Sequence, residues 1–131
     1  MNKDYRKSCQ VFTPQSIVEQ LLDWCNYREN LYGKKVMENS CGEGHILQEV
    51  VRRYIDDSIT KNISKDKIKN GLENDIYGIE CDKEKYNICL KTINKVVKEY
   101  EITNVNWKNI ILGDTLKIEI KEKFDYIVGN P

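Results

Sequence analysis

The residue types best suited to chemistry lie in one short run, ENSCGEG, at residues 38–44. Two glycines in a loop between a strand and a helix let the backbone approach a ligand closely. Glu38 and Glu43 in this run would repel a pyrophosphate, but they would attract an ammonium group or a positive sulfonium. S-adenosylmethionine carries both of these cations. The run therefore predicts a site for that cofactor, although a plain tight turn has the same glycine spacing.

A second acidic cluster, Glu80-Cys81-Asp82, follows the hydrophobic residues 76–79. Glu80 is placed to accept hydrogen bonds from both hydroxyl groups of a ribose. The alternative is that a carboxylate here only caps the next helix, a role that suits Asp82. Along an extended segment Glu80 and Asp82 share one side while Cys81 points the other way, so both roles can hold together.

Two more polar positions, Asp114 and Asn130-Pro131, follow hydrophobic segments. Asp114 can accept a hydrogen bond from an adenine amino group, or it can be a turn residue. The side-chain oxygen of Asn130 and a nearby backbone carbonyl can together accept both hydrogens of an exocyclic amino group. Such acceptors favour a pyramidal nitrogen whose lone pair can attack a sulfonium methyl group. Taken alone, however, Asn-Pro is more typical of a turn after a strand.

Alternating strands and helices must position these clusters. The residue pattern predicts strands at 36–38, 76–80, 107–112 and 124–128, and helices from Thr13-Pro14 to Cys25, from 45 to 55 and from 83 to 100. Residues 56–75 fit either a short helix or a surface excursion, and residues 26–35 fit a loop with a turn at Gly33. The alternation indicates an α/β fold with a mostly parallel sheet of about four strands and flanking helices. Ligands of such sheets bind at the carboxyl ends of the strands, where all four polar clusters fall.

Composition restricts the class of protein. The 131 residues suffice for one domain, and 21 basic residues balance 21 acidic ones, so we expect no tight DNA binding by this segment alone. We expect no signal peptide, membrane span or metal site, since His45 has no second histidine to join it. The five cysteines are odd in number and form no C-x-x-C pair, which favours reduced thiols and a cytoplasmic location.

Together the motifs resemble the adenine-N6 DNA methyltransferases of restriction-modification systems. The family's aromatic-Thr-Pro segment matches residues 12–14, its glycine motif residues 38–44, and its Asn-Pro-Pro-aromatic motif begins at residue 130. The resemblance implies a Rossmann-like fold that binds S-adenosylmethionine, and it covers residues 11–131. It implies catalytic roles for Asn130 and Pro131, and cofactor-binding roles for Phe12, Thr13, Pro14, Glu38, Ser40, Cys41, Gly42, Gly44, Glu80, Cys81 and Asp114.

The resemblance also implies an organisation. We expect a single, partial methyltransferase domain over residues 1–131, with an N-terminal helical segment at 1–34 and a Rossmann-like core at 35–131. Asn39 replaces the proline that is usual in the glycine motif, and the second proline and the aromatic residue of the catalytic motif do not follow Pro131. DNA would thus be bound through missing or partner domains. An exposed last strand at residues 124–128 would favour a homo-oligomer.

Three other interpretations stay open at this point. The same catalytic motif acts on RNA bases and on a protein glutamine, whose amide nitrogen is similarly delocalised. A non-catalytic cofactor-binding or interaction module would explain the incomplete catalytic motif. An NAD-binding domain is disfavoured, because the loop lacks a third glycine and carries two glutamates.

Overall fold

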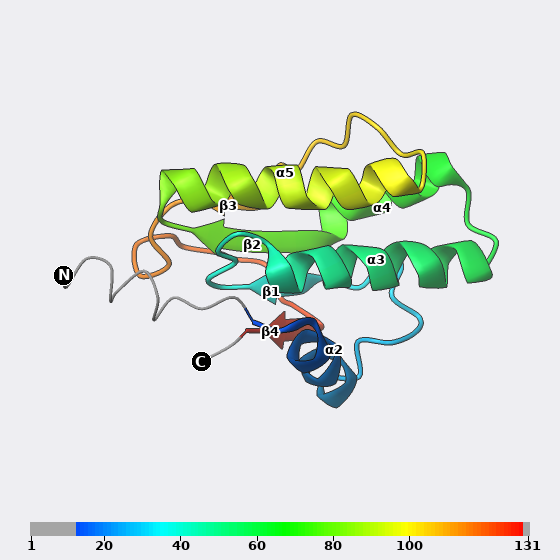
Figure 1. Cartoon of the computed structure of the whole chain (residues 1–131), viewed down its shortest axis with the longest axis horizontal. Coiled ribbons are helices and arrows are strands. Elements are labelled where there is room, and N and C mark those ends of the chain that lie inside the picture. Colours follow the sequence, from blue (N-terminus) through cyan, green and yellow to red (C-terminus); the bar gives the residue numbers. More distant parts are fainter. Residues whose placement is uncertain (1–12, 130–131) are drawn as a thin grey trace.

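The computed structural model describes residues 13–129, so Phe12, Asn130 and Pro131 lie outside the described part of the chain. Helices and strands alternate as the sequence predicts (Figure 1). The elements are α2 (Gln15–Trp24), β1 (Val36–Glu38), α3 (His45–Thr60), α4 (Lys65–Asp75), β2 (Ile76–Glu80), α5 (Lys83–Glu99), β3 (Ile110–Leu112) and β4 (Tyr126–Val128). None of the helices in this range is long and apolar enough to cross a membrane.

The four strands form one parallel sheet in the order β3-β2-β1-β4. Successive strands β1, β2 and β3 are added on one side, and β4 returns to the other side of β1. The strand order therefore reverses between β1 and β4, which is where ligands bind in open parallel sheets. The register places Glu38 at the end of β1 opposite Val128 of β4 and Gly78 of β2.

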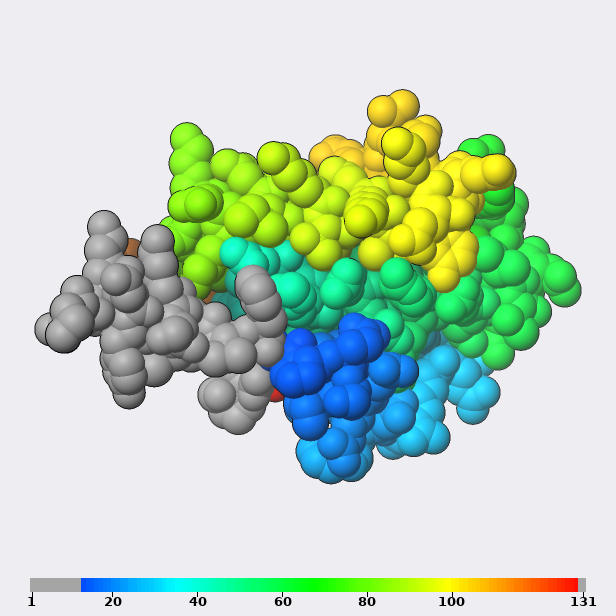
Figure 2. Space-filling model, in the orientation of Figure 1, coloured from blue at the N-terminus to red at the C-terminus, as the bar shows by residue number. Residues whose placement is uncertain are grey.

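The two faces of the sheet are covered differently. On one face Val36 and Ile76 join a large core with the inward side chains of all four helices. Figure 2 shows α3 lying between α2 and α5 on this side, in agreement with the contacts among the three helices. On the other face Met37, Tyr77 and Ile79 pack against side chains from residues 118–124, and no helix from the described range contributes to that cluster.

Residues 56–75, which the sequence leaves undecided, are helical for most of their length. They form the last turn of α3 and the whole of α4. A short connection separates the two helices, and within it Asn62 has a φ of 62°. Ser64 caps α4 by accepting a hydrogen bond from the Lys67 backbone N–H at 3.3 Å. Ile68 and Leu72 are fully buried in the main core, which explains why a mainly charged segment folds as a helix here.

Three elements begin later than the sequence predicts. The N-cap of α2 is Pro14, not Thr13, so the helix starts one residue later than expected. The third strand starts at Ile110, because residues 107–109 form a turn in which the Ile110 N–H donates to the Trp107 carbonyl at 3.1 Å. The fourth starts at Tyr126, after Asp125 accepts a hydrogen bond from the Lys35 N–H at 2.9 Å. The turn at Gly33 is confirmed by its φ of 83°.

Candidate cofactor site at the strand ends

The glycine loop after β1 is held against the end of β2 by hydrogen bonds that its backbone N–H groups donate. The Cys41 N–H donates to the Ile79 carbonyl at 3.0 Å, and the Gly42 N–H donates to Oε1 of Glu80 at 2.9 Å. Figure 1 shows this loop, the loop after β3 and the end of β4 on the same side of the molecule. The sheet thus brings together three of the four polar clusters that the sequence singles out.

Glu80 is the central acceptor of this site. Its side chain is buried, with the residue 8% exposed, and its Oε2 accepts a second hydrogen bond from the Asp82 N–H at 2.8 Å. A carboxylate has about four lone-pair positions. Two of them hold backbone N–H groups, which leaves two for the hydroxyls of a ribose. Asp82 has the capping role, since its Oδ1 accepts from the Lys85 N–H at 3.1 Å, and Cys81 between them is exposed.

The two glycines of the loop have different structural roles. Gly44 has a φ of 92°, and a Cβ added there would lie 3.2 Å from Sγ of Cys89 in α5. This glycine therefore lets the loop pack closely onto α5. Gly42 has a φ of 54° and a Cβ added there would meet nothing within 4 Å. Its backbone faces open space, as the approach of a ligand requires.

Glu38 lies at the point where the strand order reverses. Glu38 is 2% exposed, and its Oε1 accepts a long hydrogen bond of 3.4 Å from the Ser40 N–H. Burial away from water raises the pKa of Glu38 to about 7, against the lowering effect of Ser40, and the nearby Glu80 adds to the rise. A Cβ added at Gly129 would lie 3.5 Å from the same Oε1. Glu38 is therefore a poorly compensated carboxyl beside the end of β4.

The loop after β3 joins the other two. The Gly113 N–H donates to the Glu80 carbonyl at 2.9 Å, and the Thr115 hydroxyl donates to the Asn39 carbonyl at 2.9 Å. Asp114 has the turn role that the sequence allowed, since its Oδ1 accepts from the Leu116 N–H at 2.9 Å. The contact of Asp114 with an adenine amino group, which the resemblance implies, stays a prediction. Thr115 itself carried no recognisable signal in the sequence.

Cys41 is buried beneath the loop, with its Sγ 3.8 Å from Sγ of Cys89. The hydrogen bond with Cys89 and burial both raise the pKa of the Cys41 thiol well above its usual range. A protonated thiol is a poor nucleophile, so the environment of Cys41 is that of a packing residue, and its predicted contact with the cofactor stays a prediction. Within residues 13–129 no group of three or more metal-binding side chains is close enough to hold a metal ion.

Three further predicted residues, Thr13, Pro14 and Ser40, lie in the described part of the chain. Thr13 and Pro14 lead into α2, and His45 is the first residue of α3, directly after the glycine loop. Ser40 is exposed and lies in the turn after β1. The described structure thus gathers Glu38, Gly42, Glu80 and Asp114, while the placement of Phe12, Asn130 and Pro131 stays a prediction.

Comparison with known protein families shows which proteins are related to this chain. Residues 2–131 match the family model of the N-6 DNA methylases. The chain belongs to the N-6 DNA methylase family. Among its relatives in this family it is 33% identical to the type II methyltransferase M.BstVI of Geobacillus stearothermophilus, over 97% of the chain. It is 30% identical to the modification methylase CviBIII of Paramecium bursaria Chlorella virus NC1A, over 92% of the chain.

The match covers only 25% and 24% of these two relatives, so this N-6 DNA methylase chain spans about a quarter of their length. Solved structures show the same fold. The Type ISP restriction-modification enzyme LlaGI aligns with a TM-score of 0.64 and 19% identity, over 92% of this chain and 11% of that one. The EcoKI M protein of a type I restriction enzyme aligns with a TM-score of 0.62 and 18% identity, over 82% and 21%. These enzymes confirm a Rossmann-like methyltransferase fold for the chain.

An RNA methyltransferase from Salinibacter ruber, solved with S-adenosyl-L-homocysteine, aligns with a TM-score of 0.54 and 18% identity, over 89% of this chain and 58% of that one. Its likeness to this chain concerns the fold.

Proposed function

We propose that this chain binds S-adenosylmethionine and takes part in methylating the N6 amino group of adenine in DNA. Membership of the N-6 DNA methylase family supports the reaction. The observation that carries the cofactor is the acidic site at the strand ends, where Glu38 and Glu80 flank a glycine loop at the reversal of strand order. The methyltransferase from Salinibacter ruber, which has this fold, was solved with the demethylated form of the cofactor.

Each residue of the site has a task in this proposal. Glu80 accepts the ribose hydroxyls, and Glu38 faces the positive methionine part of the cofactor, where a carboxylate offsets the charge. Gly42 leaves room for the cofactor beside the backbone, and Asp114 accepts from the adenine amino group. S-adenosylmethionine, when bound, supplies a methyl group on a positive sulfonium. Asn130 and Pro131 would hold the target amino group in the geometry that frees its lone pair.

A methyl-transfer assay tests the reaction. Because activity of this chain alone is not expected, the chain is joined to the DNA-binding and remaining catalytic segments that the resemblance implies. The joined protein is incubated with unmethylated DNA and S-adenosylmethionine labelled in the methyl group, and the DNA is digested to nucleosides. We expect label in N6-methyldeoxyadenosine. We also expect the rate of methyl transfer to fall at least about 100-fold in the Asn130→Ala variant, because one hydrogen-bonding group that stabilises the transition state contributes on this order. Label in cytosine, in RNA or in a protein glutamine, or no label in any of these acceptors, would contradict the proposed substrate.

Self-association through β4 stays a prediction. β4 is an edge strand of the sheet as described, and Ile127 on it is 64% exposed. Exposed apolar edge strands pair with other chains. We expect light scattering after size exclusion to show a dimer or larger species, and Ile127→Lys to shift it toward monomer. A monomer at high concentration in the unsubstituted protein would contradict this prediction.

A further inference from the structure

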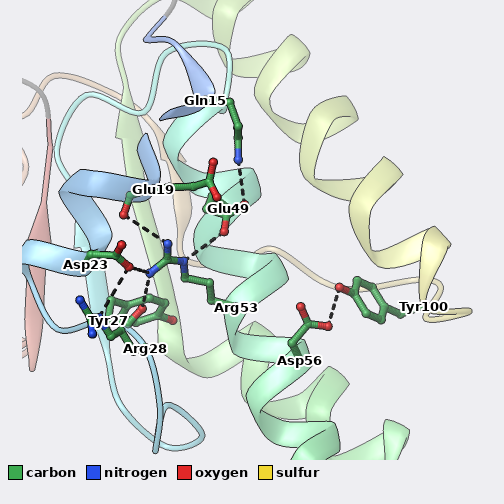
Figure 3. A network of polar contacts seen from close by, with 9 residues as sticks. All are labelled: Gln15, Glu19, Asp23, Tyr27, Arg28, Glu49, Arg53, Asp56 and Tyr100. Atoms are coloured by element: carbon green, nitrogen blue, oxygen red, sulfur yellow. Dashed lines mark hydrogen bonds and ion pairs between the residues drawn. The ribbon is translucent and has the colours of Figure 1, made fainter. Parts of the chain in front are cut away.

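A row of polar groups runs along the side of α2 that faces α3. Gln15, Glu19 and Asp23 are spaced four residues apart and therefore share one face of α2, and Tyr27 lies in the turn beyond its end. Figure 3 shows the side chains of Gln15 and Asp23 and the backbone carbonyls of Glu19 and Tyr27 in contact with Glu49 or Arg53 of α3. The contacts between α2 and α3 thus include a polar seam beside the apolar one made by Val18 and Leu22.

Arg53 uses all three of its nitrogens in this seam. Its Nε donates to Oε2 of Glu49 at 3.0 Å, and its Nη1 donates to Oδ1 of Asp23 at 2.8 Å and to the Tyr27 carbonyl at 3.2 Å. Its Nη2 donates to the Glu19 carbonyl at 3.2 Å. The other oxygen of Glu49 accepts from Nε2 of Gln15 at 3.1 Å. The pair therefore contacts α2 from its first residue to the turn beyond its end.

The two α3 side chains of the seam are largely buried, whereas the Asp23 side chain on α2 is 44% exposed. The Arg53 side chain is 16% exposed and that of Glu49 is 11% exposed. The hydrogen bond from Arg53 lowers the pKa of Asp23, against a smaller rise from desolvation. A fixed guanidinium fork with several acceptors gives geometric specificity as well as energy.

The first three residues of α2, Gln15 to Ile17, are exposed. Its N-cap, Pro14, makes no side-chain capping bond, and Ile17 in the first turn is 43% exposed. The first fully buried side chain of the helix is that of Val18. The Gln15–Glu49 bond is therefore a polar tie between the beginning of α2 and α3.

The Gln15–Glu49 bond places the start of α2 about one helical turn along α3 from the glycine loop. α3 starts at His45, directly after the glycine loop, and Glu49 lies one turn into it. α2 starts at Gln15, directly after Thr13 and Pro14. We propose that Glu49 and Arg53 are positioning residues, which set the Thr13-Pro14 segment against the glycine loop and so determine cofactor affinity. The inference rests on the proposed function for its ligand, but its structural part is testable without one.

The experiment separates positioning from stability. Gln15→Leu removes only the donor at the start of α2, and Gln15→Lys restores a donor to Glu49. Arg53→Met removes the fork but keeps an apolar side chain. Arg52→Met is the matched control, because Arg52 directly precedes Arg53 in α3 but pairs with Glu99 of α5 at 3.5 Å. Each variant is measured for S-adenosylmethionine affinity, thermal unfolding and amide hydrogen exchange.

We expect Gln15→Leu to weaken S-adenosylmethionine binding about tenfold, the effect of one hydrogen bond to a charged group, and to lower the unfolding midpoint by no more than about 5 °C. Gln15→Lys should recover the wild-type affinity. Arg53→Met should weaken binding at least as much and lower the midpoint by about 10 °C, since it leaves the largely buried Glu49 carboxylate without its ion-pair partner. Arg52→Met should change neither, as is usual for an exposed pair.

Hydrogen exchange supplies the test that needs no ligand. The Ile17 and Val18 N–H groups both donate to the Pro14 carbonyl at 3.0 Å, so they report on the first turn of α2. Their exchange should be faster in Gln15→Leu than in Gln15→Lys. Equal exchange, or wild-type affinity in Gln15→Leu, would overturn the positioning role. Failure of the wild type to bind S-adenosylmethionine would instead contradict the proposed function, and exchange alone would then decide whether the tie exists.

Discussion

The Glu80→Ala variant is expected to bind S-adenosylmethionine about 100-fold more weakly than the wild type. Glu80 would lose two hydrogen bonds from the ribose, each worth about 1.5 kcal/mol or more to a charged acceptor. The substitution would also release the Gly42 N–H, which donates to Oε1 of Glu80 at 2.9 Å, and so loosen the glycine loop. Calorimetric titration at a pH near 8 measures the change directly.

Asp82→Ala is the control for this prediction. Asp82 lies two residues away and caps α5 through its bond from the Lys85 N–H at 3.1 Å. Its loss should lower the free energy of unfolding by about 1 kcal/mol, as is typical for an N-cap, with little effect on cofactor affinity. Equal affinities of the wild type and Glu80→Ala, with both folded, would remove Glu80 from the cofactor site.

Cofactor binding is expected to strengthen as the pH rises from about 5.5 to 7. The pKa of Glu38 is raised to about 7 in the free protein, mainly by burial. The positive cofactor favours the carboxylate, so binding below this pKa must release a proton. In that range affinity should rise by up to about tenfold per pH unit, because the ammonium group of the cofactor stays protonated there. Titrations in buffers of different ionisation enthalpy would detect the released proton.

The same carboxyl predicts how stability varies with pH without ligand. The folded protein holds the Glu38 proton up to about pH 7, whereas the unfolded chain releases it near 4.5. The unfolded state therefore binds fewer protons in this window, and the free energy of unfolding falls as the pH rises, by roughly 3 kcal/mol in total from this group. Glu38→Gln should remove both this slope and the pH dependence of affinity. A variant that keeps both slopes would show that another group titrates.

Periodicity was sufficient to predict most of the fold. The apolar spacing of residues 83–100 predicts α5, whose Cys89, Ile93, Val96 and Val97 are indeed buried. The segment 56–75 was harder because its helix is held by only a few apolar residues and by polar groups that are buried through tertiary contacts. Asp75, for example, is 6% exposed and accepts from the Gly33 N–H at 2.9 Å. Such partners, 42 residues apart, leave no local pattern.

The site was predictable in its members but not in its internal bonds. Parallel strands end at one edge, so residues after β1, β2 and β3 had to meet there. That Glu80 would bind the Gly42 N–H, or Thr115 the Asn39 carbonyl, depends on loop geometry that no spacing encodes. Arg53 likewise resembles an ordinary exposed helix residue in the sequence, since its partners Asp23 and Tyr27 belong to another element.

The central claim is that the acidic strand-end site binds S-adenosylmethionine. The most direct test is a calorimetric titration of the folded protein with S-adenosylmethionine at pH 8, with NAD in a parallel titration. We expect saturable binding of one S-adenosylmethionine per chain, competition by S-adenosylhomocysteine and no binding of NAD, because Glu38 and Glu43 repel a pyrophosphate. Binding of NAD in preference to S-adenosylmethionine, or no heat and no competition from a folded chain, would contradict the account.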